Sequence, residues 1–530
     1  MAVLTVGAMA LASGTTSSSP GGTAISATTK PFGNLNIAAV WQSGSIDPAV
    51  NGTTVTFQAL GAAVFDTLVD LDANGQVRPA LAERWEISTD GKTHTFYIRK
   101  GVKFHDGSGL TGADVKFSME RILAPESTNA DSTIWRGAIA SIEMKDDYTV
   151  VLHLKDPLFE LLKGISDYGG SQAVLPKAYI EKNGVDYFRK NPIGSGPWKI
   201  TKLNYGSRVE YEAFENNWRA KPKYQNITLI HVKEEATKIA MLKTGELDIA
   251  QVAPDSVAGL KAAGLRVLGV DGGSQYTQVF FYDLNNPSKY PTGEVRVRHA
   301  MLIATDRQEM ANTILGGYGE PTRLWFVPNR AFANDPSVIP VEPFNPDGAK
   351  KLLADAGYSN GFDNTMYDTA TGGSGQGSLA STINTAIVGY WQKIGIKTKM
   401  IPMEFTAFSA LYRPVMKPEV MGTSFGTISG GGQLGFEKLV TVYHGTKGTL
   451  KNMTIPRVDE LIDKIPITTD PAQKKQMQLE AATLIRNNYT CLPILDIRSL
   501  LAIGSKVGDI TISRGLLFFE NNYDLITHSK

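Results

Sequence analysis

The stretch from 274 to 307, SQYTQVFFYDLNNPSKYPTGEVRVRHAMLIATDR, decides how the chain is divided into domains. Residues 277–284 are rich in aromatic and β-branched side chains, which favour a strand, and asparagines and prolines then interrupt it. Over residues 297–304, apolar side chains recur at the spacing of a helix that covers a core. One domain therefore ends and another begins within this stretch. A strand that crosses between two domains would form the floor of a cleft, and such clefts are common ligand sites.

Length, charge and cysteine content limit the classes of function. A chain of 530 residues is too long for one core and is expected to form about three domains of about 150 residues each. The 53 lysines and arginines nearly balance the 52 acidic residues, so the charge gives no reason to expect nucleic acid as a partner. The single cysteine, Cys491, excludes an intramolecular disulfide and is expected to be a small buried hydrophobe.

Residues 1–32 resemble a signal peptide followed by a flexible tether. The run Ala2–Ala12 is apolar, and the residues from Ser13 to Lys30 are almost entirely Ser, Thr, Gly, Ala and Pro. No basic residue precedes the apolar run, and no cysteine for lipid attachment stands near Ser13. A released protein, a replaced attachment residue and a short tail without function all stay open. No later segment approaches 18 consecutive apolar residues, so no membrane span is expected.

Four segments carry recognisable patterns: GVKFHDGSGLTGADVKFSMER at 101–121, NPIGSGPWKI at 191–200, EATKIAMLKTGELDIA at 235–250 and EVRVRHAMLIATDR at 294–307. In the first, Thr111 is placed as a helix N-cap, and His105 and Asp106 suit the turn before that helix better than a catalytic role. The four segments resemble, in order and spacing, the signature segments of the extracytoplasmic solute-binding proteins of ABC importers. The branch is the large one of dipeptide, oligopeptide and nickel binders. The resemblance runs from about Leu35 to about Arg498.

This resemblance implies an α/β protein with a two-lobed periplasmic-binding-protein fold, type II-like, with an additional inserted domain and a hinge cleft between the lobes. The implied domains are a signal-like segment and tether at 1–32, a discontinuous first lobe at 33–70, 191–282 and 500–530, an inserted domain at 71–190, and a second lobe at 283–499. Crossings near Asp283 and Arg498 would form the hinge.

The second lobe supports this fold independently of the resemblance. Asn345 and Pro346 open a helix that Gly357 ends, the expected order of cap, first-turn proline and terminal glycine. A helix over 381–395 and a strand over 396–403 follow. Repeated alternation of helix and strand is typical of α/β layering.

The function that the resemblance implies is capture of a small-molecule solute by an extracytoplasmic receptor, which delivers it to the permease and ATPase subunits of an ABC importer. We expect a monomer in the periplasm, or on the cell surface if the precursor is lipid-anchored, without a cofactor. No catalytic constellation appears: the seven histidines show no HExxH spacing, and the Gly-rich runs 372–377 and 430–432 lack a phosphate-loop ending. A hydrolase with unrecognised carboxylates and a metal-chelate receptor with histidines in its cleft remain the rival hypotheses.

The ligand is expected to differ from an ordinary peptide. In peptide-binding relatives, the corresponding strand and loop of the second lobe usually carry an aspartate that pairs with the free amino group of the peptide. Here that segment, 421–435, contains no carboxylate. An unpaired buried charge costs several kcal/mol, so a peptide ammonium group would lack its partner unless Asp283 or Glu404 supplied the charge.

Neutral hydrogen-bonding groups and aromatic rings remain as candidate ligand contacts. They are Trp41, Gln42 and Ser43 in an early loop, Tyr276, Gln278 and Phe280 along the crossing strand, and Ser424, Phe425, Thr427, Ser429 and Gln433 in the second lobe. Such groups suit an oligosaccharide, a glycoside or a small aromatic compound. Arg413 would receive the carboxylate of an aromatic acid. Core packing of the aromatic rings and a solvated Arg413 are the alternatives.

Overall fold

The computed structural model describes most of the chain after residue 30. The described residues are 31–41, 45–50, 56–72, 76–129, 132–158, 161–166, 172–219, 221–285, 288–324, 337–368, 377–403, 405–412, 416–430, 453–468, 470–510, 523 and 526–529. The signal-like segment and tether therefore lie almost wholly outside the described residues. Among the helices that are described, none is both long and apolar enough to cross a membrane.

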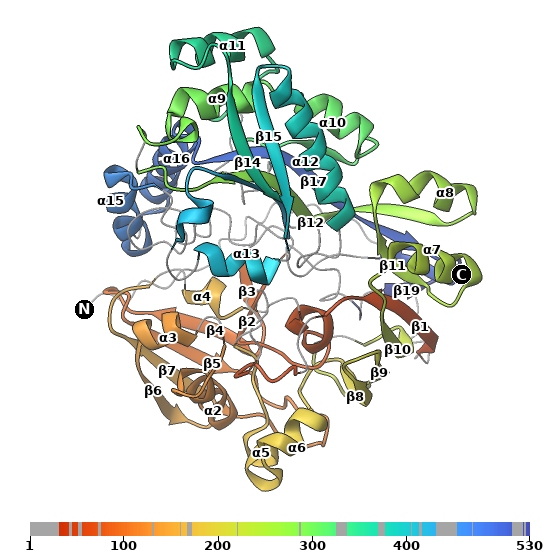
Figure 1. Ribbon diagram of the computed structural model, residues 1–530. Coiled ribbons are helices and arrows are strands. Elements are labelled where there is room, and N and C mark those ends of the chain that lie inside the picture. The colour runs from red at the N-terminus through yellow and green to blue at the C-terminus, as the bar shows by residue number, and fades with distance from the viewer. Residues whose placement is uncertain are drawn as a thin grey trace, which may run out of the picture.

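An 11-stranded mixed sheet runs through the molecule in the order β15-β14-β16-β12-β17-β11-β1-β10-β9-β8, with β13 paired to β17. At one end lie the strands of what we call the first lobe: β1 (Phe32–Ala39), β8 (Trp198–Asn204), β9 (Arg208–Ala213), β10 (Tyr224–His231) and β11 (Ile249–Val252). At the other end lie those of the second lobe: β13 (Gly319–Pro321), β14 (Phe362–Asp368), β15 (Ile396–Pro402) and β16 (Ser424–Gly430). Figure 1 shows the second lobe at the top and the first-lobe strands at the lower right.

Two long neighbouring strands connect the lobes. They are β12 (Arg266–Phe281) and β17 (Cys491–Ile503), which pair in antiparallel fashion along their lengths. β17 pairs with β13 up to Ile497 and with β11 from Leu500, so it changes lobe at Arg498, near the expected crossing. The register of β12 against β17 shifts between Val270 and Gln275, so β12 changes lobe earlier than the expected position near Asp283.

A separate four-stranded antiparallel sheet lies at the lower left of Figure 1. Its strands are β4 (Ala82–Ile87), β5 (Thr93–Ile98), β6 (Ile139–Asp146) and β7 (Thr149–Leu154), covered by α2 (Gly112–Leu123). The helix starts at the expected capping box, in which Thr111 and Asp114 satisfy each other's backbone N–H groups. Phe96, Met119 and Leu152 belong to the hydrophobic cluster of this unit, which Leu68, Val69 and Trp218 join from the adjoining first-lobe ranges. The boundaries 71 and 190 stay a prediction.

Shorter elements complete the first lobe and the inserted unit. They are β2 (Val69–Leu71), β3 (Val77–Pro79), α3 (Ser132–Ala138), α4 (Leu161–Gly164), α5 (Lys177–Asn183), α6 (Val185–Lys190), α7 (Glu235–Thr244), α8 (Val257–Ala262), β18 (Val507–Ile510) and β19 (Ile526–His528). The first-lobe core gathers apolar side chains from β1, β9, β10 and β17.

The second lobe buries both faces of β12. Its helices are α9 (Val295–Ile303), α10 (Arg307–Thr313), α11 (Pro346–Asp355), α12 (Gly377–Gln392), α13 (Phe405–Tyr412), α15 (Pro456–Lys464) and α16 (Pro471–Asn487). Val279 and Phe281 pack with side chains of α9 and α12, whereas Phe280 packs on the opposite face with side chains of α13, α15 and α16. The predicted helix over 381–395 is present but begins and ends earlier, and the predicted strand 396–403 is β15.

Two arginines of the segment EVRVRHAMLIATDR are buried and bind backbone carbonyls. The Arg298 guanidinium donates to the carbonyls of Thr292, Gly293, Asn488 and Tyr489 at 2.7 to 2.9 Å. Arg307 donates to the carbonyls of Thr322 at 2.9 Å, of Pro493 at 3.0 Å and of Glu342 at 2.8 Å. Burial lowers the pKa of each guanidinium to about 10. This segment therefore holds loops and the strand β17 in place.

Replacing Arg307 by methionine should destabilise the protein. Three buried carbonyls would lose their donor, and we expect unfolding free energy to fall by about 3 kcal/mol or more. Urea unfolding followed by circular dichroism measures the change. The matched control is Arg457→Met, since Arg457 is half-exposed and pairs only with surface carboxylates. Equal effects of the two substitutions would contradict this role of Arg307.

Candidate functional site

The carboxyl ends of parallel strands from both lobes point toward each other. In the second lobe, β14, β15 and β16 are parallel, and the last residue of β16 pairs with Gln275 next to the lobe crossing. In the first lobe, β1 is parallel to β11, and the end of β11 at Val252 pairs with Leu500, also next to the crossing. In open α/β sheets, ligands bind outside the carboxyl ends of strands. The candidate site is therefore the space between these two sets of ends.

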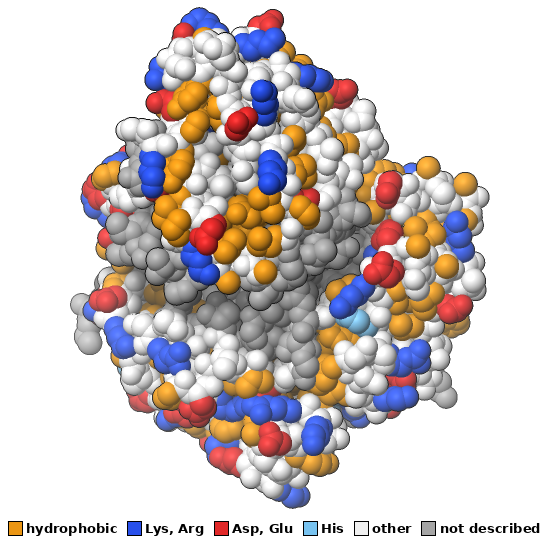
Figure 2. All heavy atoms as spheres, viewed as in Figure 1, with side chains coloured by type: hydrophobic (Ala, Val, Ile, Leu, Met, Phe, Trp, Pro, Cys, Tyr) orange, Lys and Arg blue, Asp and Glu red, His pale blue; other side chains and the backbone are white. Residues whose placement is uncertain are grey.

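The outer surface beside this space has no dominant charge. On the face drawn in Figure 2, basic and acidic side chains are interspersed over the described residues of both lobes. Such a mixed surface gives little long-range attraction for a strongly charged solute. Recognition then depends on the side chains at the strand ends.

Three cross-strand rows bring half of the predicted site residues to one face of the sheet. Tyr276, Gln278 and Phe280 alternate along β12, and each lies opposite a residue of β16. These partners are, in the same order, Ser429, Thr427 and Phe425. The side chains of Tyr276 and Gln278 are each 1% exposed, so a solute reaches them only after a movement that opens this face.

The aromatic members of these rows lie in a hydrophobic cluster. The rings of Phe280 and Phe425 stack at 6.1 Å between centroids, and Phe425 lies 4.3 Å from Phe408 of α13. Both Phe280 and Phe425 are 3% exposed. Their surroundings agree with core packing, and a contact of either ring with the ligand stays a prediction. The two polar rows, Tyr276 with Ser429 and Gln278 with Thr427, lie nearer the lobe crossing and are better placed to contact a ligand.

Ser424 lies on the other face of β16. It is fully buried, accepts from the Asn364 amide at 3.2 Å and donates to the Thr365 carbonyl at 3.2 Å. Side chains alternate along a strand, so Ser424 and Thr427 point to opposite faces. The structure therefore does not bring Ser424 together with the other second-lobe candidates.

Trp41 lies at the carboxyl end of β1, where its ring is largely packed. Its indole N–H donates to the Tyr205 carbonyl at 2.6 Å, and its ring lies 4.5 Å from that of His231. The side chain is 4% exposed, so little of it is available to a solute. The remaining candidates, Gln42, Ser43, Arg413 and Gln433, lie outside the described residues, as does Glu404.

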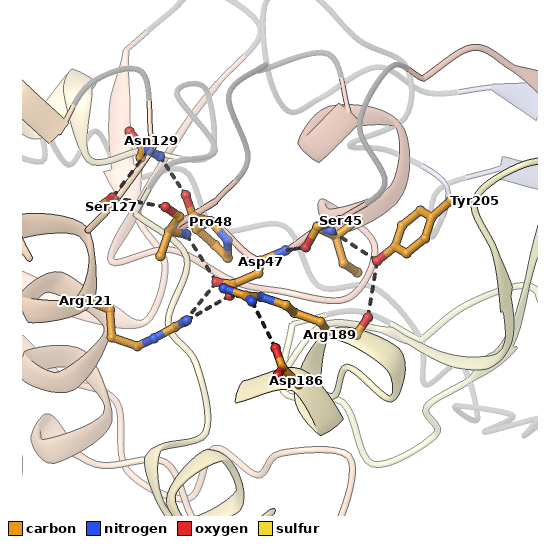
Figure 3. A network of polar contacts seen from close by, with 11 residues as sticks. Ser45, Asp47, Pro48, Arg121, Ser127, Asn129, Asp186, Arg189 and Tyr205 are labelled. Atoms are coloured by element: carbon orange, nitrogen blue, oxygen red, sulfur yellow. Dashed lines mark hydrogen bonds and ion pairs between the residues drawn. The ribbon is translucent and has the colours of Figure 1, made fainter. Parts of the chain in front are cut away.

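The loop segment 45–50, which follows Trp41 in sequence, is fixed by a buried carboxylate (Figure 3). Asp47 accepts a bidentate pair from Arg121 of α2, at 2.9 and 2.8 Å, and a third hydrogen bond from Arg189 of α6, at 3.2 Å. Its side chain is fully buried. The partners lie 74 and 142 residues away in sequence, so no local pattern indicates this network. The loop is thereby tied to the inserted unit before any ligand arrives.

His105 is held by the glycine-rich turn of the second sequence segment. Its Nδ1 accepts from the Gly194 N–H at 3.3 Å, and its Nε2 lies 2.9 Å from the Gly196 carbonyl. A ring that accepts at Nδ1 and donates at Nε2 is neutral, and burial lowers the pKa of His105 to about 4. A Cβ at Gly194 would lie 2.1 Å from the Val64 carbonyl, so this turn needs glycine. These contacts give His105 a structural role, as the sequence predicts.

Metal-binding and thiol chemistry find little support in the described part of the chain. No group of three or more His, Cys, Asp or Glu side chains among the described residues is arranged to hold a metal ion. Cys491 is 2% exposed, which confirms the predicted buried hydrophobe, and burial raises its pKa.

Comparison with known proteins gives a consistent family. Residues 76–441 match the model of the bacterial extracellular solute-binding proteins, family 5 Middle. The glutathione-binding protein GsiB of Salmonella choleraesuis is 30% identical over 361 residues, covering 68% of this chain and 67% of that protein. GsiB of Escherichia coli O1:K1 is 26% identical over 470 residues, covering 87% of this chain and 88% of that protein.

Solved structures share the fold over almost the whole chain. AgaA of A. tumefacien R10, in complex with agropinic acid, matches with a TM-score of 0.74 at 25% identity and covers 94% of this chain and 98% of its own. CtaP of Listeria monocytogenes matches with a TM-score of 0.79 at 21% identity. The match covers 94% of this chain and 100% of the CtaP chain. The expected two-lobed fold is confirmed.

Substitution of Asp47 by asparagine should destabilise the folded protein. Removing one partner of a buried ion pair leaves the guanidinium of Arg121 without its charge partner, so we expect a loss of about 3 kcal/mol. Urea unfolding measures it. Asp186→Asn is the matched control, because Asp186 contacts the same Arg189 but its side chain is 88% exposed. A similar loss in both variants would show that burial of Asp47 is not the cause.

Acid should destabilise the protein through His105. Its pKa is near 4 when folded and about 6.5 when unfolded, so the unfolded state binds the proton first. This contribution, up to about 3 kcal/mol, is complete above pH 6.5 and is lost as the pH falls toward 4. The stability difference between the wild type and His105→Gln should therefore shrink from pH 7.5 to pH 4.5 in urea unfolding. A constant difference would contradict the assignment.

Proposed function

Because the chain belongs to the bacterial extracellular solute-binding proteins, family 5, we propose that it captures a polar uncharged or aromatic solute between its lobes. Members of this family are extracytoplasmic receptors that work with the permease and ATPase subunits of ABC importers, and receptor rather than enzyme is the family's role. We further propose that this protein acts as a monomer.

The ligand class rests on the polar rows beside the crossing. Tyr276 and Gln278 of β12 and Thr427 of β16 present hydroxyl and amide groups on one face of the sheet. The described residues 421–430, which lie along the same wall, contain no carboxylate. An ordinary peptide would bring an ammonium group to the β16 side of this wall, which offers no matching charge. An oligosaccharide, a glycoside or an aromatic acid fits these neutral groups better.

The two connecting strands explain how binding is turned into a signal. Contacts from β12 and β16 and from the loop after β1 engage one ligand together only when the lobes approach. A ligand that gains contacts in the closed form shifts the population toward it. The importer then recognises the closed, ligand-bound conformation.

A thermal-shift screen tests the ligand class. A solute that binds only the folded protein at 100 times its Kd stabilises it by about 2.7 kcal/mol, which raises the melting temperature measurably. We expect saccharides or aromatic acids to give this shift. Strong stabilisation by free-amino dipeptides and tripeptides, with no effect of saccharides or aromatic acids, would overturn the proposal.

A peptide of the glutathione type is the second candidate. Relatives that are 30% identical over 361 residues carry the name glutathione-binding protein. The same screen therefore includes reduced glutathione as a separate arm. Stabilisation by glutathione alone would move the proposal to this class.

Substitution of Thr427 by valine should weaken ligand binding. Valine has nearly the same shape but no hydroxyl, so one hydrogen bond to the ligand is lost and affinity should fall about tenfold. Isothermal titration with the solute found in the screen measures it. The matched control is Ser424→Ala on the opposite face of β16, which should leave the Kd unchanged. Unchanged affinity in Thr427→Val would remove this residue from the site.

A further inference from the structure

We propose that Asp496 orients the ligand by accepting hydrogen bonds from its donor groups and excludes a ligand carboxylate from that end of the cleft. This inference rests on the proposed function and narrows its ligand class. The class becomes a solute whose headgroup donates hydrogen bonds, through neighbouring hydroxyls or an ammonium group. Among the three proposed classes it favours oligosaccharides and glycosides over aromatic acids.

The register places Asp496 in the first polar row. It lies on β17 directly opposite Tyr276 of β12. In an antiparallel pair, side chains of opposite residues lie on the same face with their Cβ atoms about 5 Å apart. Asp496 therefore extends the row that Tyr276 shares with β16.

The neighbours of Asp496 confirm which face it occupies. Leu495 and Ile497, on either side of it, belong to the apolar cluster with Val279 and Phe281. Side chains alternate along a strand, so Asp496 points to the opposite face, which is that of Tyr276 and Gln278. Its exposed fraction is 7%, so the carboxylate is kept largely from bulk water.

The chemistry of a carboxylate determines what it selects. Two oxygens with about four lone-pair positions accept hydrogen bonds and donate none. Charge-assisted hydrogen bonds from hydroxyl or ammonium donors are stronger than neutral ones. A second carboxylate at the same place meets a like charge in a partly desolvated environment. Hydrogen-bond donors are therefore favoured and anions are rejected.

A second acid lies in the same row. Glu320 of β13 is opposite Asp496 on the other side of β17 and is exposed. Like charges directly opposite each other in a ladder are destabilising. An anion bound beside them would add a further like charge, whereas a hydrogen-bond-donating headgroup would not. The two carboxylates thus favour the same class of headgroup.

The test compares four probes on the full chain: a neutral disaccharide, an amino sugar, benzoate and reduced glutathione. We expect the disaccharide or the amino sugar to bind the wild type and to bind Asp496→Asn at least tenfold more weakly in isothermal titration. The matched control is Asp114→Asn, because Asp114 is also 7% exposed but lies in the capping box of α2 in the inserted unit, away from the strand ends of the candidate site. Its Kd should equal that of the wild type.

Ionic strength separates the two donor groups. Binding through an ammonium group should weaken as salt is raised from 50 to 500 mM, since the charge pair is screened, whereas binding through hydroxyls should not. Either result is consistent with Asp496 as the acceptor. The salt series identifies which headgroup is bound.

Equal affinity of the wild type and Asp496→Asn for the saccharide probes would overturn the inference and leave the proposed receptor function intact. Tight binding of benzoate by the wild type, unchanged in Asp496→Asn, would overturn it as well. Stabilisation by glutathione alone would instead overturn the proposed ligand class. Should the asparagine variant fail to fold, Asp496→Glu keeps the charge and must still prefer a saccharide to benzoate. Loss of that preference would count against the inference.

Discussion

The backbone ladder between β12 and β17 is the interaction on which the rest of the structure depends. Both connections between the lobes run through it. On its other side, β17 pairs with β11 in the first lobe and with β13 in the second, and β12 pairs with β16 in the second. Arg307 binds the carbonyl of Pro493, so α10 also fixes the course of β17. Because this strand pair is continuous with both lobes, its register determines where the side chains of β12 and β17 lie at the cleft.

Features that are local in sequence could be predicted, and features set by register could not. The capping box at Thr111, the helix after Pro346 and the strand through Phe280 follow from spacing and propensity over a few residues. Ser424 and Thr427 are both polar and are both predicted site residues. Because side chains alternate along a strand and the spacing of these two residues is odd, they point to opposite faces of β16. Asp47 and Asp496 depend on strands or helices far along the chain, and nothing in their neighbouring residues shows what they face.

The sequence segments that carry the family resemblance mostly serve the fold. His105 and Gly194 lock a turn against the first lobe, and Arg298 and Arg307 bind loop carbonyls. These groups are buried and their hydrogen bonds are internal, so they say which scaffold is present but not which solute it binds. The proposed ligand contacts Tyr276, Gln278 and Thr427 lie on β12 and β16, outside these segments. Recognition of the family and recognition of the ligand therefore depend on separate parts of the chain.

The loss of register between Val270 and Gln275 has a consequence for motion. Two strands that stay hydrogen-bonded on both sides of such an interruption bend together, since neither can slide without breaking the ladder of the other. Independent linkers would leave the lobes free to twist and translate as well. We therefore expect the lobes to move mainly by bending of the two strands at the interruption. Less orientational freedom of the lobes is then lost on closure than with independent linkers, so less of the contact energy with the solute is spent on ordering the protein.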